Sequence, residues 1–153
     1  MEQLDKIITA LPDVINHNVE TVPRLYPTVR PRADFERSLK ILEFVKLKSK
    51  RIITKSGFMV GLGEERDEII GIMKELRKVK VDVLTIGQYM QPSKNHHPVI
   101  RYIHPDEFRN YKEIGLKMGF RLIESAPLVR SSYHAERVKK IIKKTAMKDD
   151  IAG

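Results

Sequence analysis

The sequence contains neither cysteine nor tryptophan in its 153 residues. The lack of cysteine excludes disulfides, thiolate-ligated zinc and any iron–sulfur cluster held by this chain's own thiolates. No apolar run approaches the ~20 residues that a helix needs to span a bilayer. The segment from Met1 to Leu11 lacks the basic start and apolar core of a secretory signal. We therefore expect no membrane partner and a cytoplasmic location.

Basic side chains outnumber acidic ones, with 29 Lys and Arg against 20 Asp and Glu and a net charge of +9. Such a surface favours acidic partners: nucleic acid, an anionic membrane or an acidic protein. Aromatic residues do not alternate with basic ones in the manner of an RNA-binding surface, so nothing beyond the net charge points to nucleic acid and we do not expect it as the partner. The length is that of one domain with one core.

Strand and helix patterns alternate along the chain. Strands are predicted at 14–15, 51–56, 81–90 and 120–124. Helices are predicted at 35–48, at 64–80, at 105–118 and after 135. Asp34 is the expected N-cap of the first, and Gly119 follows the last turn of the third. The lysines of the last helix are expected to face water. The proline-rich stretch 22–32 is predicted to be a stiff, basic connection rather than a helix.

This alternation is typical of parallel βαβ units, so the fold class is α/β. Three to four parallel strands make only a small sheet, and a parallel sheet normally buries both of its faces. Neither edge of the sheet has an evident cover in the sequence. We therefore expect part of a larger barrel, with helices on its outer face and an edge open to another chain or to a second copy.

The stretch from Thr54 to Glu65 is predicted to end a strand, make a glycine-rich turn and begin a helix. Its glycines allow close backbone approach, and a helix N-terminus offers free N–H groups to an anionic ligand. The spacing fits neither the dinucleotide fingerprint nor a phosphate loop. Taken alone, such a turn more often connects a strand to a helix without binding anything.

Polar residues follow three of the predicted strands. In a parallel sheet the carboxyl ends of the strands lie on one rim, so these residues can converge on one ligand. The alternative, equally compatible with the pattern, is that they only cap and solvate the strand ends. The residues are His17, Asn18, Glu20, Lys55, Ser56, Gly57, Gly87, Gln88 and Tyr89.

Ordered segments of the chain resemble lipoyl synthase, a family of the radical S-adenosylmethionine superfamily. They occur in the order and spacing of that family from about Pro12 to Ala135. The segments are 16–26, 54–64, 87–93, 101–102 with 105–108, and 127–135. The resemblance implies the C-terminal half of a partial TIM barrel at 1–126, followed by an extension at 127–153 that carries an Arg-Ser-Ser-Tyr motif and a basic helix.

The resemblance also implies an activity, namely sulfur insertion into octanoyl groups carried by an acidic lipoyl domain. S-adenosylmethionine and two 4Fe–4S clusters are the cofactors of the family. By this resemblance the cofactor-binding residues are Asn18, Glu20, Lys55, Gly57, Gly61, Glu64 and Gln88. Ser131, the first serine of the motif, corresponds to a ligand of the auxiliary cluster.

The chain departs from the family by lacking both cysteine triads and the first strands of the barrel. One serine oxygen cannot assemble a cluster that requires soft ligands. We therefore expect a chain that is inactive alone and works with a cysteine-bearing N-terminal half in trans. The alternative is a truncated, non-catalytic relic that acts as a binding module for S-adenosylmethionine or an acidic protein.

Overall fold

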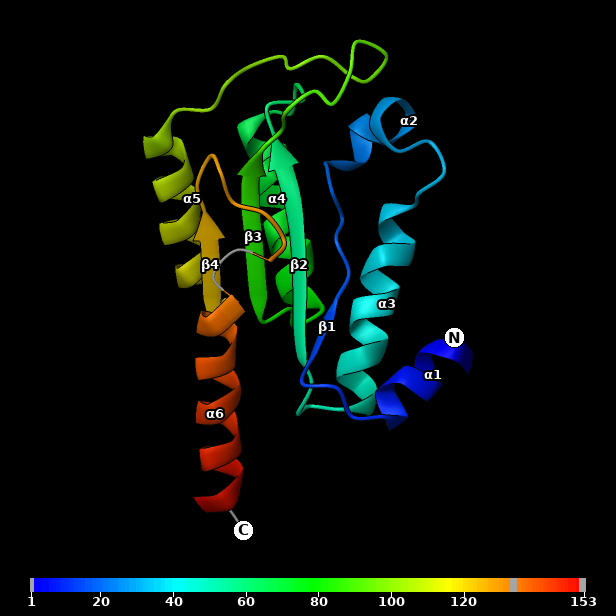
Figure 1. The fold of residues 1–153 in the computed structure, drawn as a ribbon, viewed down its shortest axis with the longest axis vertical. Helices are drawn as coiled ribbons and strands as arrows, with labels where there is room; N and C mark the ends of the chain where they lie inside the picture. The colour runs from blue at the N-terminus through cyan, green and yellow to red at the C-terminus, as the bar shows by residue number, and fades with distance from the viewer. Residues whose placement is uncertain (1, 133–134, 152–153) are drawn as a thin grey trace.

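The computed structural model describes residues 2–132 and 135–151 and contains one parallel sheet in the order β1-β2-β3-β4 (Figure 1). The strands are β1 (Val14–Asn16), β2 (Ile53–Val60), β3 (Val83–Gln88) and β4 (Leu122–Ser125). In register, Ser56 lies opposite Leu84, and Leu84 lies opposite Ile123. Each strand is thus followed in the sheet by the next strand of the sequence, as expected for successive βαβ units.

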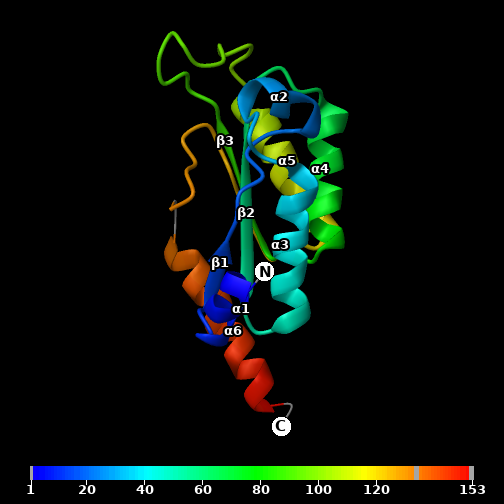
Figure 2. The same cartoon turned by 90° about the vertical axis from the view of Figure 1, so that its right-hand side faces the viewer.

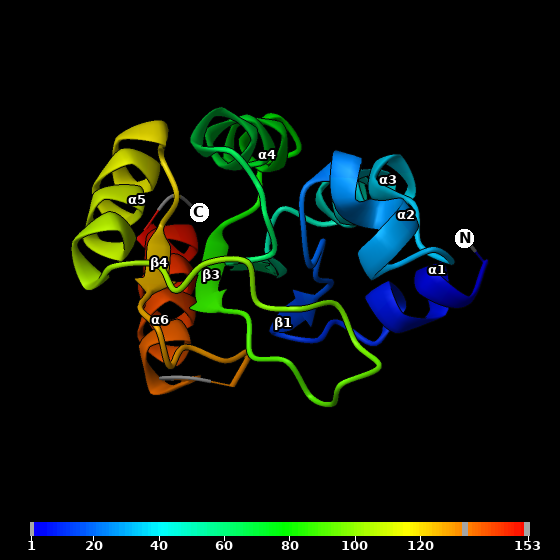
Figure 3. The same ribbon diagram turned by 90° about the horizontal axis from the view of Figure 1, so that it is seen from above.

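Helices α3 (Phe35–Lys48), α4 (Arg66–Lys78) and α5 (Pro105–Met118) lie on one face of the sheet (Figure 2). Seen from above, they form an arc around the strands that is open on the other side (Figure 3). This arrangement confirms the predicted α/β fold with a parallel sheet and outer helices, and it is consistent with a segment of a TIM-like barrel.

The helix ends have the chemistry that the sequence predicted. The Asp34 carboxylate accepts a hydrogen bond from Arg37 N at 2.7 Å and so caps α3. Gly119 ends α5 with a φ of 100°, in the left-handed region that glycine enters without strain. Glu65 and Glu68 form a capping box at the start of α4.

Two local predictions were wrong. The stretch predicted as a non-helical connection contains a 3₁₀ turn at Pro23–Leu25 and the short helix α2 (Tyr26–Val29), because proline fits the first positions of a helix. Strand β2 continues to Val60 rather than ending at Ser56, so the glycine-rich turn is shorter than predicted. A short amphipathic helix, α1 (Glu2–Thr9), precedes β1.

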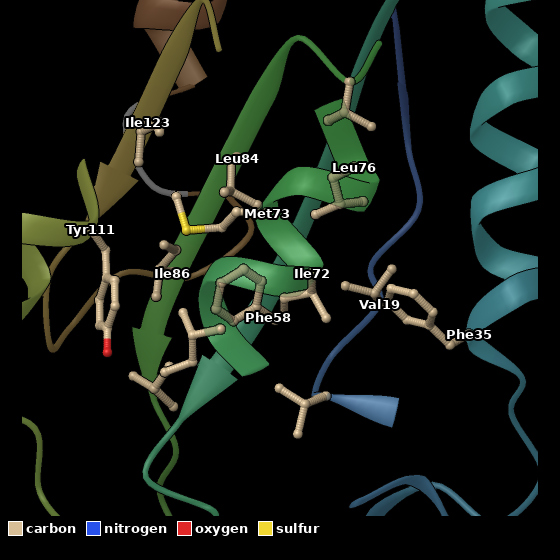
Figure 4. Packing of buried hydrophobic residues seen from close by; sticks show 14 of the residues in the cluster. Val19, Phe35, Phe58, Ile72, Met73, Leu76, Leu84, Ile86, Tyr111 and Ile123 are labelled. Atoms are coloured by element: carbon tan, nitrogen blue, oxygen red, sulfur yellow. The ribbon is translucent and has the colours of Figure 1, made fainter. Parts of the chain in front are cut away.

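The main core lies between the sheet and the outer helices (Figure 4). Alternate residues of the central strands point to this face, because successive side chains of a strand point to opposite sides. Phe58, Leu84, Ile86 and Ile123 from the strands pack with Ile72, Met73 and Leu76 of α4 and Tyr111 of α5.

The opposite, inner face is partly covered by α6 (Ala135–Ile151). Val138 of this helix is buried against Ile53 and Val83, with Ile141 and Ile142 packed beside it. Lysines of α6 are exposed as predicted: Lys139, Lys140, Lys143 and Lys144. Within the described residues, none of the helices has the length and apolarity that crossing a membrane requires.

Candidate functional site

A pocket of about 230 Å³ opens on the inner face, towards the carboxyl ends of β2 and β3. Helix α6 covers the inner face nearer the amino ends of the strands, so the helix and the pocket occupy different parts of this face. The pocket is lined by Asn18, Glu20, Gly57, Phe58, Met59, Thr85, Gly87, Gln88, Met90, Val129, Arg130 and Ser131. It therefore brings together Asn18, Glu20, Gly57 and Gln88 of the predicted cofactor-binding residues, together with Ser131.

Two glycines line the pocket at positions where neighbouring groups leave no space for a side chain. A Cβ on Gly57 would lie 2.3 Å from Thr85 Oγ1 and 3.3 Å from Asn18 Oδ1. A Cβ on Gly87 would lie 2.4 Å from the carbonyl oxygen of Val129. A side chain at either position would displace its neighbours, so glycine at 57 permits the close approach of the Thr85 side chain, and glycine at 87 permits that of the Val129 backbone.

The side-chain oxygen of Asn18 is buried and has no hydrogen-bond partner. Leaving a buried acceptor unsatisfied costs about 1–3 kcal/mol, so native structures rarely keep one without a reason. Because this oxygen lies near Gly57 and Asn18 lines the pocket, an N–H or O–H group of a ligand in the pocket would satisfy it.

Glu20 has a left-handed backbone conformation, with a φ of 67°. Its N–H donates to Gly57 O at 3.0 Å, and its carbonyl oxygen accepts from Met59 N at 2.9 Å. The carboxylate lies 3.3 Å from the Arg30 guanidinium. Such strain in a non-glycine residue is typical of functional sites, and here it accompanies a carboxylate at the pocket.

Lys55 and Ser56 lie in the middle of β2 rather than at its end, because the strand continues to Val60. Lys55 is buried on the inner face, and its ammonium donates a hydrogen bond to the carbonyl oxygen of Ser131. Burial lowers the pKa of the Lys55 side chain, and the nearby Glu124 carboxylate opposes this shift. Ser56 points to the opposite face, towards the outer helices.

Gly61 and Glu64 form the turn between β2 and α4 and do not line the pocket. The Glu64 carboxylate accepts hydrogen bonds from Gly61 N at 2.6 Å and from Leu62 N at 2.9 Å. A Cβ on Gly61 would lie 2.4 Å from Arg101 O. The backbone donors at 61 and 62 thus already have a partner within the turn, which favours the ligand-free interpretation of this turn.

Gln88 borders the pocket, but its carboxamide forms hydrogen bonds with the loop that leads into α5. Its Nε2 donates to Arg101 O at 3.1 Å, and its Oε1 accepts from Ile103 N at 2.9 Å. The neighbouring Tyr89 hydroxyl donates to His97 O at 2.8 Å. Gln88 and Tyr89 therefore hold the loop of residues 91–104 above the sheet.

Thr85, Met90 and Arg130 line the pocket although the sequence analysis did not select them. Thr85 could have been found, because it lies two residues before Gly87 and alternate residues share a face of a strand. His17, selected at the strand end, instead contacts Ser38 Oγ of α3 through Nε2 at 3.1 Å. It does not line the pocket.

No protein-family model matches the chain. It is 59% identical over 137 residues to a protein of Caldicellulosiruptor saccharolyticus named lipoyl synthase, a match that covers 90% of this chain and 48% of that protein. The lipoyl synthase of Caldicellulosiruptor bescii is 54% identical over 141 residues, which cover 92% of this chain and 48% of that protein. The lipoyl synthase of Rubrobacter xylanophilus is 56% identical over 134 residues, which cover 88% of this chain and 42% of that protein. The chain is homologous to the C-terminal part of lipoyl synthase.

The chain spans about half the length of the curated lipoyl synthases it matches. This chain contains no cysteine, and the described residues include no group of His, Asp and Glu side chains that could hold a metal ion. Ser131 is exposed beside the pocket, whereas Tyr133 of the same motif lies outside the described residues. The donor set of the described residues does not fit an iron–sulfur cluster.

Proposed function

We propose that this chain supplies the S-adenosylmethionine-binding wall of a lipoyl synthase. The proposal rests above all on the unsatisfied oxygen of Asn18, a residue that lines the pocket. S-adenosylmethionine carries hydroxyl and amino donors for such an oxygen. The residues present thus fit this cofactor, and homology to lipoyl synthase supports its choice over other ligands of the same shape.

In this proposal Asn18 and Glu20 accept hydrogen bonds from the ribose or the amino-acid part of the cofactor. Gly57 and Gly87 let the Thr85 side chain and the Val129 backbone pack closely and so shape the pocket that receives it. Gly61, Glu64 and Gln88 act indirectly, because their hydrogen bonds hold the turn and the loop that surround the pocket. When bound beside a reduced cluster, S-adenosylmethionine supplies the radical chemistry of the superfamily, and the chain's own residues only bind and orient it.

We further propose that the chain alone does not catalyse sulfur insertion into octanoyl groups. It has no thiolate to hold either cluster, so the cysteines must come from outside these 153 residues. Residues 1–126 then form half of the barrel, and residues 127–153 form an extension whose motif borders the pocket. Within the described residues β1 pairs only with β2, so its other edge can accept the preceding strands of the barrel or a second copy of the chain.

The net charge of +9 supports an acidic lipoyl carrier domain as the protein substrate. Opposite net charges accelerate the encounter of two proteins, and this acceleration weakens as salt is added. In the proposal the pocket end of the sheet faces the carrier's acyl group.

Isothermal calorimetry with S-adenosylmethionine tests the binding proposal on two samples: the chain alone and the chain with a cysteine-bearing N-terminal half of a lipoyl synthase. We expect the complex to bind more tightly than the chain alone, because the other half completes the site. Equal, tight binding by the chain alone would instead support the binding-module alternative.

The variant Asn18→Ala removes the unsatisfied oxygen, and Asn95→Ala removes the same group from an exposed loop. We expect Asn18→Ala to weaken binding by the complex about tenfold, the value of one good hydrogen bond, and Asn95→Ala to leave it unchanged. A complex that binds no S-adenosylmethionine, or binds it equally well with Ala at position 18, contradicts the proposal.

A further inference from the structure

A buried lysine connects the central strand to the segment that carries Ser131. Lys55 is only 6% exposed, in the middle of β2, and its Nζ donates to the carbonyl oxygen of Ser131. We infer that Lys55 is a positioning residue that fixes the segment 127–132 against the sheet and thereby sets one wall of the pocket. The inference depends on the proposed function only for the identity of what the pocket binds.

The surroundings of Lys55 leave its ammonium dependent on this carbonyl. Glu124, the carboxylate whose charge acts on Lys55, is itself buried and forms an ion pair with Arg137 of α6 at 2.8 Å. A buried charge without a partner is strongly unfavourable, so the ammonium needs a fixed acceptor. The cost of breaking the contact makes it a strong restraint on the position of Ser131.

The rest of the segment is held by contacts that end at Val129. Val129 is buried, its carbonyl oxygen lies over Gly87, and its N–H donates to Ala126 O at 3.1 Å. Gln88 N donates to Pro127 O at 3.2 Å. Arg130 makes a hydrogen bond to its neighbour Val129, which fixes nothing to the sheet. Among the residues that the structure describes, Lys55 is thus the sheet residue whose side chain reaches beyond Val129 to Ser131.

The contact also separates two hollows of the inner face. Ser131 lines both the pocket and a second hollow of about 420 Å³ between β1, β2 and α6, which Lys55 lines as well. The second hollow has the apolar side chains of Val14, Val138 and Ile142. Without the Lys55 contact, the backbone at Ser131, which lies between the two hollows, would no longer be fixed to the sheet.

Amide hydrogen exchange on the chain alone tests this role. Lys55→Met keeps the aliphatic stem and removes the donor, Lys55→Arg keeps a donor, and Lys140→Met removes an exposed lysine of α6 as a control. We expect the amide of Val129, whose hydrogen bond to Ala126 O holds the segment, to exchange about tenfold faster in Lys55→Met, as local opening becomes easier. Lys55→Arg retains most of the protection, and Lys140→Met exchanges like the unmodified chain.

If Lys55 only stabilised the fold as a whole, Lys55→Met would change exchange throughout the chain and would change Tm. Replacing a buried charge by an apolar side chain can leave global stability unchanged or raise it, so the expected acceleration is confined to Val129 and occurs without a lower Tm. Acceleration throughout the chain, or none at all, overturns the inference. If Lys55→Met fails to fold, Lys55→Gln, with a donor on a shorter stem, must give the same local acceleration.

The exchange experiment needs no ligand, so it decides the role of Lys55 even if the chain and its complex bind no S-adenosylmethionine. A second measurement on the complex then connects the two proposals. If the unmodified complex binds S-adenosylmethionine, we expect Lys55→Met to weaken binding about tenfold and Lys55→Arg to weaken it less. Unchanged affinity beside accelerated exchange overturns the part of the inference that concerns the pocket wall.

Discussion

At the scale of single residues, the pocket is shaped by two glycines that have no space for a side chain and by one polar atom without a hydrogen-bond partner. Gly57 and Gly87 face positions where a Cβ would overlap a neighbour, and Asn18 presents an oxygen that nothing in the described chain satisfies. A buried unsatisfied group lowers the stability of the ligand-free fold. We interpret it as a feature kept for binding rather than for packing.

The close approach at Gly87 gives a stability prediction. Gly87→Ala should lower the free energy of unfolding by about 1–3 kcal/mol, as overpacking does, because the Val129 carbonyl in the way is backbone and cannot rotate aside. Gly71, in the middle of α4, has no atom within 4 Å of an added Cβ. As the matched control, Gly71→Ala should raise stability by about 0.5–1 kcal/mol. Urea unfolding measures both, and equal effects of the two substitutions would contradict the geometry.

His17 makes stability depend on pH. Burial and the positive charge of Arg30 lower the pKa of its imidazole below the ordinary value of 6.5, with Glu20 opposing and Arg37 adding to the shift. The unfolded chain then binds the proton more readily, so the stability contribution is complete above pH 6.5 and is lost as the pH falls through the folded-state pKa.

We therefore expect Tm to fall between pH 7 and pH 5 more steeply in the unmodified chain than in His17→Gln. His96→Gln, at an exposed loop position, should follow the unmodified chain. Scanning calorimetry across this range gives the comparison. Parallel curves for the unmodified chain and His17→Gln would show that the imidazole titrates alike in the folded and unfolded states.

At the scale of elements, the sequence predicted the helices better than the strands. The N-cap at Asp34 and the C-terminal glycine of α5 are local signals that the structure confirms. Strand β2 was predicted too short because glycine is common in turns. The strand continues past Gly57 because it pairs with β3, whose residues are distant in sequence, such as Thr85 opposite Gly57. Apolar periodicity predicted the helix α6 but could not tell which face of the sheet it covers.

The loop between β3 and α5 depends on one side chain of β3. Gln88→Ala removes the bonds to Arg101 O and Ile103 N and leaves a buried N–H unsatisfied. We expect a loss of about 1–3 kcal/mol in urea unfolding and faster proteolysis within residues 91–104. Asn95→Ala, at an exposed site in the same loop, should change neither quantity. Equal proteolysis rates for the two variants would mean that Gln88 does not anchor the loop.

At the scale of the whole molecule, the chain is a four-stranded parallel sheet with outer helices, consistent with a segment of a TIM-like barrel. Its outer helices and parallel sheet build a pocket at the carboxyl ends of the strands, where the topology of such folds puts ligands. The sequence predicted this rim, and the structure brings Asn18, Glu20, Gly57 and Gln88 to it. The unsatisfied Asn18 oxygen and the Lys55 contact had no sequence signal, because both depend on distances between separate strands and loops.

The most direct test of the account is sulfur insertion measured on an octanoylated lipoyl domain, with iron, sulfide, reductant and S-adenosylmethionine present. The chain is assayed alone, with a cysteine-bearing N-terminal half of a lipoyl synthase, and with the same half after its cysteines are changed to alanine. We expect lipoylated product only from the mixture with intact cysteines. Product from the chain alone, or none from that mixture although the two polypeptides form a complex, would contradict the account.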